Sequence, residues 1–133
     1  MRKIDTLFLV DDDPVFQFLT RKMVDRTQMV NTVKVFGNGF DAIEFLRTVQ
    51  DTADALPEVI LLDLNMPVMD GWEFLEAFRA LKPSLPRKIT IYIVSSSIAP
   101  ADVERAKSIS AVTDYIIKPI TMAQLAHALT NIS

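Results

Sequence analysis

Three carboxylates, a hydroxyl and an ammonium stand at the ends of short apolar runs in this sequence. They belong to Asp11, Asp12, Asp63, Ser95 and Lys118. The carboxyl ends of parallel strands meet at one edge of an α/β sheet, where such folds place their ligands. If the apolar runs are parallel strands, these side chains converge, although they are spread over more than a hundred residues of chain.

Such a cluster carries more negative charge than one lysine can offset. Two unit charges about 4 Å apart repel by roughly 4 kcal/mol at an effective dielectric near 20. A divalent cation would balance the remainder, and an open site made of oxygen ligands suits Mg²⁺ or Mn²⁺. A metal beside a carboxylate, a lysine and a hydroxyl can receive a dianionic phosphoryl group. The pattern therefore predicts metal-assisted phosphoryl transfer onto an aspartate.

The elements that must position these groups alternate regularly along the chain. The predicted strands cover residues 7–10, 33–36, 59–62, 89–94 and 115–117. The predicted helices cover about 14–27, a segment after Gly39, a segment between Gly71 and Pro83, a segment opened by Pro100, and Thr121 to the chain end. The run at 59–62 leads directly into Asp63 and is typical of a strand buried on both faces. The alternation predicts a doubly wound α/β fold, with five parallel strands and five helices.

Length and composition predict one globular domain of 133 residues, half of them apolar and 23% charged. The net charge of −3 argues against a nucleic-acid surface. The sequence has no cysteine and one histidine, which excludes disulfides and disfavours a zinc site. No segment approaches the roughly 20 apolar residues of a membrane span. We therefore expect a cytoplasmic protein with neither a membrane segment nor a nucleic-acid partner.

Four motifs make the chain resemble a response-regulator receiver domain of two-component signalling. They are Leu-Val-Asp-Asp-Asp at 9–13, Leu-Asp-Leu-Asn-Met-Pro-Val-Met-Asp-Gly at 62–71, Ile-Val-Ser-Ser at 93–96 and Tyr-Ile-Ile-Lys-Pro at 115–119. The resemblance covers the whole chain, with the motifs in the family's order and spacing. It implies a flavodoxin-like sheet of strand order 2-1-3-4-5. It also implies a stand-alone receiver domain over residues 1–133, without an output domain.

The resemblance implies a role for each carboxylate of the cluster. Asp63 would be phosphorylated. Asp12 and Asp63 would ligate Mg²⁺ together with the backbone carbonyl of Asn65, and Asp11 would act on the metal mainly through a water. Asn65 and Ser97 would flank the phosphoryl group and tune how fast it hydrolyses.

The resemblance also implies the parts of a switch. Lys118 would pair with Asp63 in the unmodified protein and with a phosphoryl oxygen after modification. Ser95 would move to hydrogen-bond the phosphoryl group, and Tyr115 would swing inward behind it. The peptide bond between Lys118 and Pro119 would be cis.

The function implied is a signalling switch that catalyses only its own phosphorylation and dephosphorylation. The phosphodonor would be a sensor histidine kinase or a histidine phosphotransfer protein. The fourth helix, fifth strand and fifth helix would present the face that binds a downstream protein, unless the domain relays the phosphoryl group onward. One alternative is an aspartate-dependent phosphatase or phosphotransferase of the haloacid-dehalogenase type, but such enzymes need a second aspartate where Asn65 stands. A second alternative is a binding module that works without phosphorylation.

Overall fold

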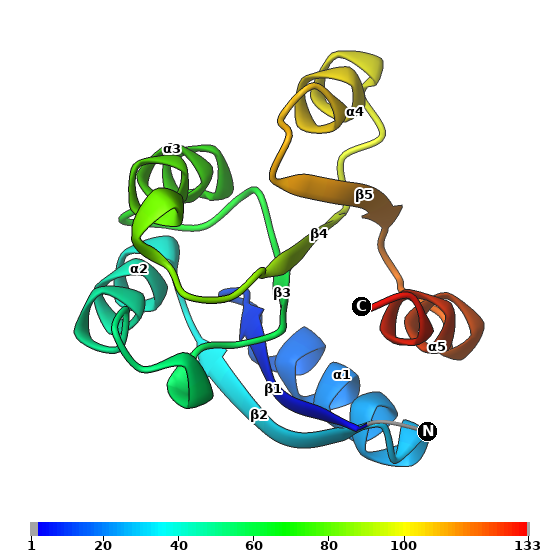
Figure 1. Cartoon of the computed structure of the whole chain (residues 1–133). Coiled ribbons are helices and arrows are strands. Elements are labelled where there is room, and N and C mark those ends of the chain that lie inside the picture. The colour runs from blue at the N-terminus through cyan, green and yellow to red at the C-terminus, as the bar shows by residue number, and fades with distance from the viewer. Residues whose placement is uncertain (1–2, 133) are drawn as a thin grey trace.

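The computed structural model describes residues 3–132, which form one sheet covered by helices on both faces (Figure 1). The strands are β1 (Ile4–Val10), β2 (Val30–Phe36), β3 (Val59–Leu62), β4 (Thr90–Ser95) and β5 (Val112–Ile117). The helices are α1 (Pro14–Thr27), α2 (Gly39–Thr48), α3 (Gly71–Leu81), α4 (Pro100–Lys107) and α5 (Met122–Thr130). Two short 3₁₀ turns, η1 (Ala53–Ala55) and η2 (Lys82–Ser84), complete the order.

The sheet has the strand order β2-β1-β3-β4-β5, and every neighbouring pair is parallel. This confirms the predicted doubly wound, flavodoxin-like fold. Helices α2, α3 and α4 lie on one side of the sheet, and α1 and α5 lie on the other (Figure 1). The alternation places the carboxyl ends of all five strands, and the loops that follow them, at one edge.

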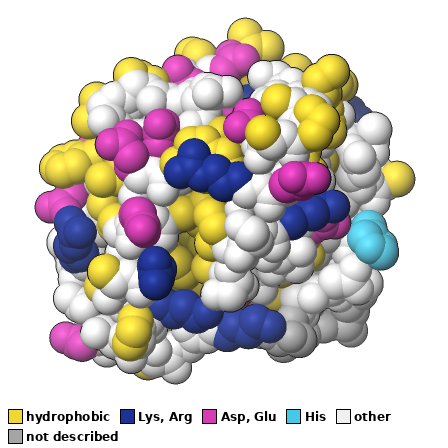
Figure 2. Space-filling model, turned by 90° about the horizontal axis from the view of Figure 1, so that it is seen from above, with side chains coloured by type: hydrophobic (Ala, Val, Ile, Leu, Met, Phe, Trp, Pro, Cys, Tyr) yellow, Lys and Arg dark blue, Asp and Glu magenta, His cyan; other side chains and the backbone are white. Residues whose placement is uncertain are grey.

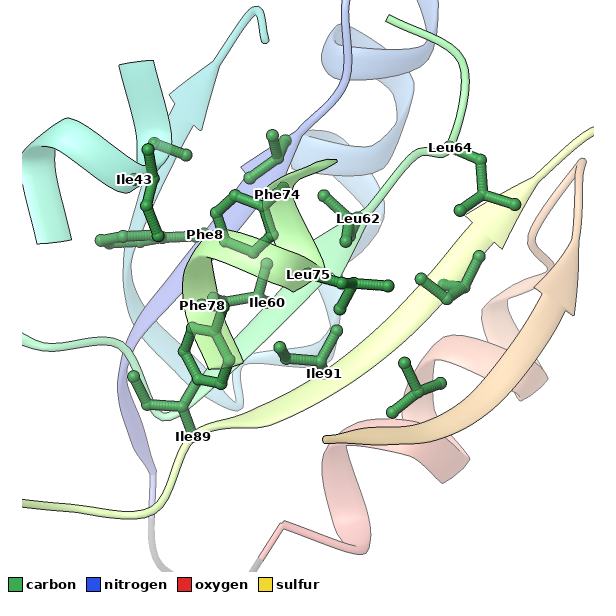
Figure 3. Packing of buried hydrophobic residues seen from close by; sticks show 14 of the residues in the cluster. Phe8, Ile43, Ile60, Leu62, Leu64, Phe74, Leu75, Phe78, Ile89 and Ile91 are labelled. Atoms are coloured by element: carbon green, nitrogen blue, oxygen red, sulfur yellow. The ribbon is translucent and has the colours of Figure 1, made fainter. Parts of the chain in front are cut away.

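Residues 7–10, 59–62 and 91–94 of the three central strands are hydrophobic, and their side chains are buried on both faces of the sheet. Phe8, Ile60 and Ile91 belong to one hydrophobic cluster, on the side of α2 and α3. Their neighbours Leu7 and Val59 belong to a second cluster, on the side of α1 and α5. Figure 3 shows aromatic side chains of α3 packed over the first face. The strand that carries the predicted acceptor is thus held between two cores.

The structure differs from the prediction mainly at the element ends. Strands β1, β2 and β5 each begin three residues earlier than predicted, at Ile4, Val30 and Val112. Their first residues mix polar and apolar side chains, so the apolar run does not reveal them. The last helix ends at Thr130, and the half-buried Ile132 packs beyond it. Ser133, also predicted to be helical, lies outside the described residues.

Local capping explains where the helices begin. The Asp13 side chain accepts a hydrogen bond from the Val15 amide at 3.0 Å at the start of α1. Thr121 and Gln124 form the predicted capping box of α5. Within residues 3–132, no helix combines the length and apolar character that a bilayer crossing requires.

Candidate functional site

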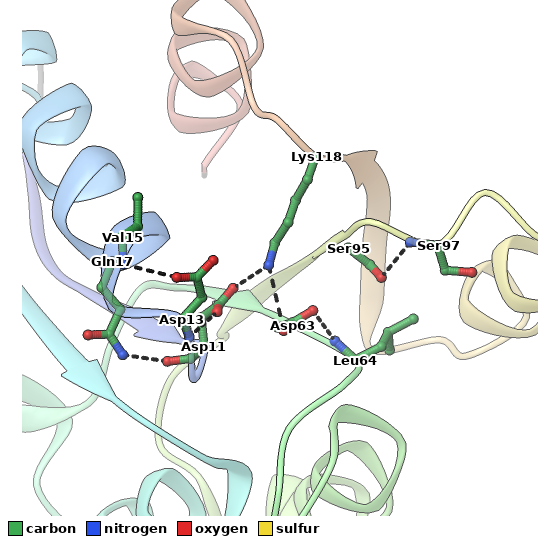
Figure 4. Close-up of polar contacts among 9 residues, drawn as sticks. All are labelled: Asp11, Asp13, Val15, Gln17, Asp63, Leu64, Ser95, Ser97 and Lys118. Carbon is green, nitrogen blue, oxygen red and sulfur yellow. Dashed lines mark hydrogen bonds and ion pairs between the residues drawn. The ribbon is translucent and has the colours of Figure 1, made fainter.

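Four of the predicted site residues meet at the carboxyl edge of the sheet (Figure 4). Asp11 follows β1, Asp63 follows β3, Ser95 ends β4 and Lys118 follows β5. The Asp63 amide donates to the Val10 carbonyl at 2.9 Å, which continues the pairing of β1 and β3 up to the acceptor. Four side chains from four strands are therefore held at one level by the sheet itself.

Asp63 is nearly buried, with 6% of its surface exposed. Its Oδ1 accepts a hydrogen bond from the Leu64 amide at 2.8 Å, and its Oδ2 lies 3.6 Å from Lys118 Nζ. One carboxylate oxygen is thus fixed by the backbone, while the other faces the ammonium.

Lys118 is closer to Asp11 than to Asp63. Its Nζ lies 2.8 Å from Asp11 Oδ2 and 4.2 Å from the centroid of the Phe16 ring, so the ammonium has an anion on one side and an aromatic face on another. The Lys118 amide donates to the Ser95 carbonyl at 2.8 Å. The Lys118–Pro119 peptide bond is cis.

The acidic cluster offers the donors that a divalent cation requires. Carboxylate oxygens of Asp11, Asp12 and Asp63 lie within 4.8 Å of one another. Asp11 and Asp63 are buried, whereas Asp12 and Asn65 are exposed, so the group opens toward solvent on one side. Asp11 Oδ2 is buried and makes no hydrogen bond of regular geometry within residues 3–132; its contact there is the ion pair with Lys118. Three carboxylates facing one ammonium fit a hard cation with oxygen ligands.

The pKa values of the two buried carboxyls are both raised above their ordinary value. Burial raises the pKa of Asp63 to about 6, and repulsion from Asp11 adds to the effect. Lys118 and the backbone amides of Asn65 and Leu64 oppose it. Burial also raises the pKa of Asp11, against the stabilising contact with Lys118. A bound cation would favour the ionised forms of both carboxyls.

On the other side of Asp63, hydroxyl groups tie β4 to α4 and β5. Ser95 is fully buried, and its Oγ accepts from the Ser97 amide at 3.1 Å. The Ser97 hydroxyl donates to Asp102 Oδ2 in α4 at 2.6 Å. Tyr115 is buried and donates its phenolic hydroxyl to the Ser97 carbonyl at 2.9 Å. The Tyr115 ring therefore already lies inward, and the Ser97 side chain is engaged by α4.

Sequence reasoning assigned no role to three residues that shape the site. The Phe16 ring contacts the Lys118 ammonium, and the Gln17 side-chain amide donates to the Asp11 backbone carbonyl at 2.6 Å. Gly71 lies against the acceptor loop: an added Cβ would lie 2.4 Å from the Asp63 carbonyl oxygen. No local pattern in the sequence predicts these contacts, because they form only when the chain folds.

Comparison with known proteins agrees with this geometry. The family model of the response regulator receiver domain matches residues 7–130. A crystal structure of a two-component response regulator from Cytophaga hutchinsonii is 32% identical, with a TM-score of 0.87 and coverage of 98% of this chain and 96% of that one. The phosphorylated cyanobacterial phytochrome response regulator RcpA is 29% identical, with a TM-score of 0.76 over 99% and 91% of the two chains.

Among curated relatives, the probable methanogenesis regulatory protein FilR2 of Methanothrix harundinacea is 27% identical over 95% of this chain and 79% of its own length. The chain spans about half the length of other curated response regulators that it matches. The fold and the site define a phosphoacceptor signalling domain. The chain belongs to the response regulator receiver domain family of two-component signalling.

Proposed function

We propose that Asp63 accepts a phosphoryl group from a phosphohistidine on a partner protein. A carboxylate oxygen of Asp63 forms the new bond to phosphorus, the bond from phosphorus to the imidazole nitrogen breaks, and the nitrogen leaves with its electron pair. The product is an acyl phosphate on Asp63 and a free histidine. The observation that carries the proposal is the buried Asp63 carboxylate, with Asp11 and Asp12 within 4.8 Å and Lys118 at 3.6 Å.

Mg²⁺ is the cofactor that we propose, with Mn²⁺ as a possible substitute. Asp12, Asp63 and the backbone carbonyl of Asn65 would hold it, and Asp11 would contact it through a water. When bound, the cation would neutralise charge on the phosphoryl oxygens. Lys118 would bind a phosphoryl oxygen from the other side, since its ammonium already lies between the two buried carboxylates.

We propose that the response to phosphorylation runs through Ser95 and Tyr115. The phosphoryl group adds close to two negative charges and three strong acceptors beside Ser95. If the Ser95 hydroxyl turns toward these oxygens, its hydrogen bond with the Ser97 amide is lost, and the loop that also anchors Tyr115 and Asp102 is released. The face formed by α4, β5 and α5 would then change its affinity for a downstream protein.

The surface beside the site favours a protein as phosphodonor. Val15, Phe18 and Leu19 on α1 are exposed by 65%, 58% and 53%. Large apolar side chains on one exposed helix turn favour contact with an apolar protein surface. We therefore propose that a histidine-bearing helix of a sensor kinase or a histidine phosphotransfer protein docks there.

Two residues are proposed to set the lifetime of the phosphoryl group. Asn65 is exposed at the rim of the acidic cluster, where its side chain can meet an attacking water. Ser97 would act less directly, because its hydroxyl is bound to Asp102 in α4.

The test is phosphorylation of the purified chain by acetyl phosphate, with and without Mg²⁺, followed by intact mass spectrometry. We expect one added phosphoryl group that requires Mg²⁺ and is removed by hydroxylamine, as an acyl phosphate should be. Asp63→Asn should take up none, and Asp54→Asn should behave as the wild type. Equal labelling of Asp63→Asn would overturn the assignment. Repeated turnover of a phosphate ester such as p-nitrophenyl phosphate would favour a phosphatase instead.

A further inference from the structure

A groove of about 500 Å³ lies between α3 and the end of α4, including the turn that leads into β5. Its lining includes Trp72, Leu75, Glu76, Arg79, Lys82 and Arg105. None of the residues assigned to phosphorylation or to the metal is in this lining. Figure 2 shows a hollow with apolar side chains at its base, surrounded by Lys and Arg side chains with Asp and Glu side chains among them. The groove is therefore a separate surface feature.

The floor of the groove is apolar. Leu75 is buried, while Trp72, Ile109 and Ala111 are partly exposed toward the open side. The Arg105 guanidinium lies 4.1 Å from the centroid of the Trp72 ring. The stack holds a cation directly above the apolar floor, without removing the rest of the floor from solvent.

The walls of the groove are cationic. Arg79, Lys82 and Arg105 face a single acid, Glu76. Arg79 pairs with Glu76 at 3.8 Å, but both side chains are mostly exposed, so the contact is weak. The groove thus has a surplus of positive charge on a chain whose net charge is −3. Charge complementarity points to an anionic occupant.

The shape of the groove favours an extended acidic chain over a single small anion such as phosphate. The cations are on long, exposed side chains spread over α3, η2 and α4, and they do not converge on one buried point as a site for a single phosphate would require. An extended chain can instead place an apolar side chain on the Trp72 floor and acidic side chains against the walls.

We propose that the groove between α3 and α4 binds an acidic peptide segment that carries an apolar anchor residue. The anchor contacts Trp72 and Leu75, and flanking carboxylates pair with Arg79, Lys82 and Arg105. The proposal goes beyond phosphoryl transfer and does not depend on it.

The test is selection of phage-displayed random linear peptides, built without tryptophan, on the immobilised chain. The groove variant carries Arg79→Glu, Lys82→Glu and Arg105→Glu. The control variant carries Arg21→Glu, Lys22→Glu and Arg26→Glu, which changes the net charge equally on exposed positions of α1. Circular dichroism verifies that both variants fold.

We expect enrichment of peptides with Asp or Glu around a Leu or Phe. Synthetic copies should change the emission of Trp72, the one tryptophan of the chain, and should bind wild type and control variant alike. Their affinity for the groove variant should fall by about tenfold or more. Binding should persist in Asp63→Asn, which separates this result from the fate of the proposed function. Absence of acidic peptides, or equal affinity for the groove variant, would overturn the proposal.

Discussion

Lys118 Nζ lies 2.8 Å from Asp11 Oδ2, so the sheet edge pairs the ammonium with a proposed metal-site carboxylate in the unmodified protein. A cation that approaches Asp11 competes with this ion pair. Metal binding would then weaken the contact between Lys118 and Asp11 and leave the ammonium available to a phosphoryl oxygen. The ion pair between Lys118 and Asp11 would therefore couple metal binding to binding of the phosphoryl group.

The first prediction concerns Lys118→Ala. Removing the ammonium takes one positive charge from beside the acidic cluster, so Mg²⁺ should bind several-fold more tightly. Acetyl phosphate should still label Asp63, but the change in partner affinity should be lost. Isothermal titration with Mg²⁺ measures the first effect, and weaker binding would contradict it. Lys22→Ala, on the exposed side of α1, is the matched control.

The second prediction concerns pH and Asp63. Its pKa is about 6 in the folded protein against an ordinary value of 3.8, so the folded state binds the proton more tightly than the unfolded state. Stability without metal should therefore fall as pH rises from about 4 to about 6, by up to about 3 kcal/mol, and then level off. Asp63→Asn should remove most of this fall and be the more stable protein at pH 7.

Urea denaturation in EDTA at several pH values measures the difference. Mg²⁺ should stabilise the wild type at pH 7 more than Asp63→Asn, because the cation relieves the repulsion. A wild type as stable as Asp63→Asn at pH 7 without metal would show that the Asp63 carboxylate is not penalised by burial.

The third prediction concerns Gly71. An alanine Cβ there would lie 2.4 Å from the Asp63 carbonyl oxygen and 2.8 Å from Leu64 Cα, both backbone atoms that cannot turn away. Gly71→Ala should cost about 2 kcal/mol of stability and slow phosphorylation, although alanine favours helices. Gly37→Ala is the control, since nothing lies within 4 Å of its Cβ position. Thermal unfolding of both variants measures the contrast, and equal midpoints would refute the contact.

The fourth prediction concerns the hydrogen bond between Ser97 and Asp102. A double-mutant cycle with Ser97→Ala and Asp102→Ala should give a coupling free energy of about 1 kcal/mol. The single variants should also raise hydrogen exchange at the start of α4, where the preceding Ala99 offers no side-chain cap. Additive single effects would mean that the bond does not hold α4 to the loop after β4.

The fifth prediction concerns Val68, an exposed residue with φ of 69°. A β-branched side chain is disfavoured in this left-handed region, so Val68→Gly should relieve strain of about 1 kcal/mol, less the entropy of the added glycine. Val68→Ile retains the strain and serves as the control. Urea denaturation of the two variants measures the difference, and a less stable Val68→Gly would contradict it.

The parallel alternation and the meeting of Asp11, Asp63, Ser95 and Lys118 could be predicted because each follows from a local apolar run and the rules of parallel sheets. The strand order was implied by the family resemblance and not by the apolar runs. The amino ends of β1, β2 and β5 could not, because their polar residues break the apolar pattern.

Contacts across the fold were also out of reach of sequence reasoning. The cation–π contact between Lys118 and Phe16 joins residues about a hundred positions apart. Phe16 fits the apolar pattern of a helix and Lys118 follows a predicted strand, so neither segment indicates the contact. The groove between α3 and α4 could not be predicted from the sequence either. Arg79, Lys82 and Arg105 share no motif, and only the packing of α4 beside α3 brings them together.

The contact between the Lys118 ammonium and the Phe16 ring bears on how the protein would distinguish one phosphodonor from another. Phe16 lies on the same turn of α1 as the exposed Val15, so the surface proposed for a phosphodonor and the ring beside the Lys118 ammonium are adjacent in the chain. A protein docked on this turn would also shift the lysine, whereas a small phosphodonor would not touch the turn. If donors dock as proposed, cognate and foreign donors would differ in the speed of phosphoryl transfer even where their affinities are equal.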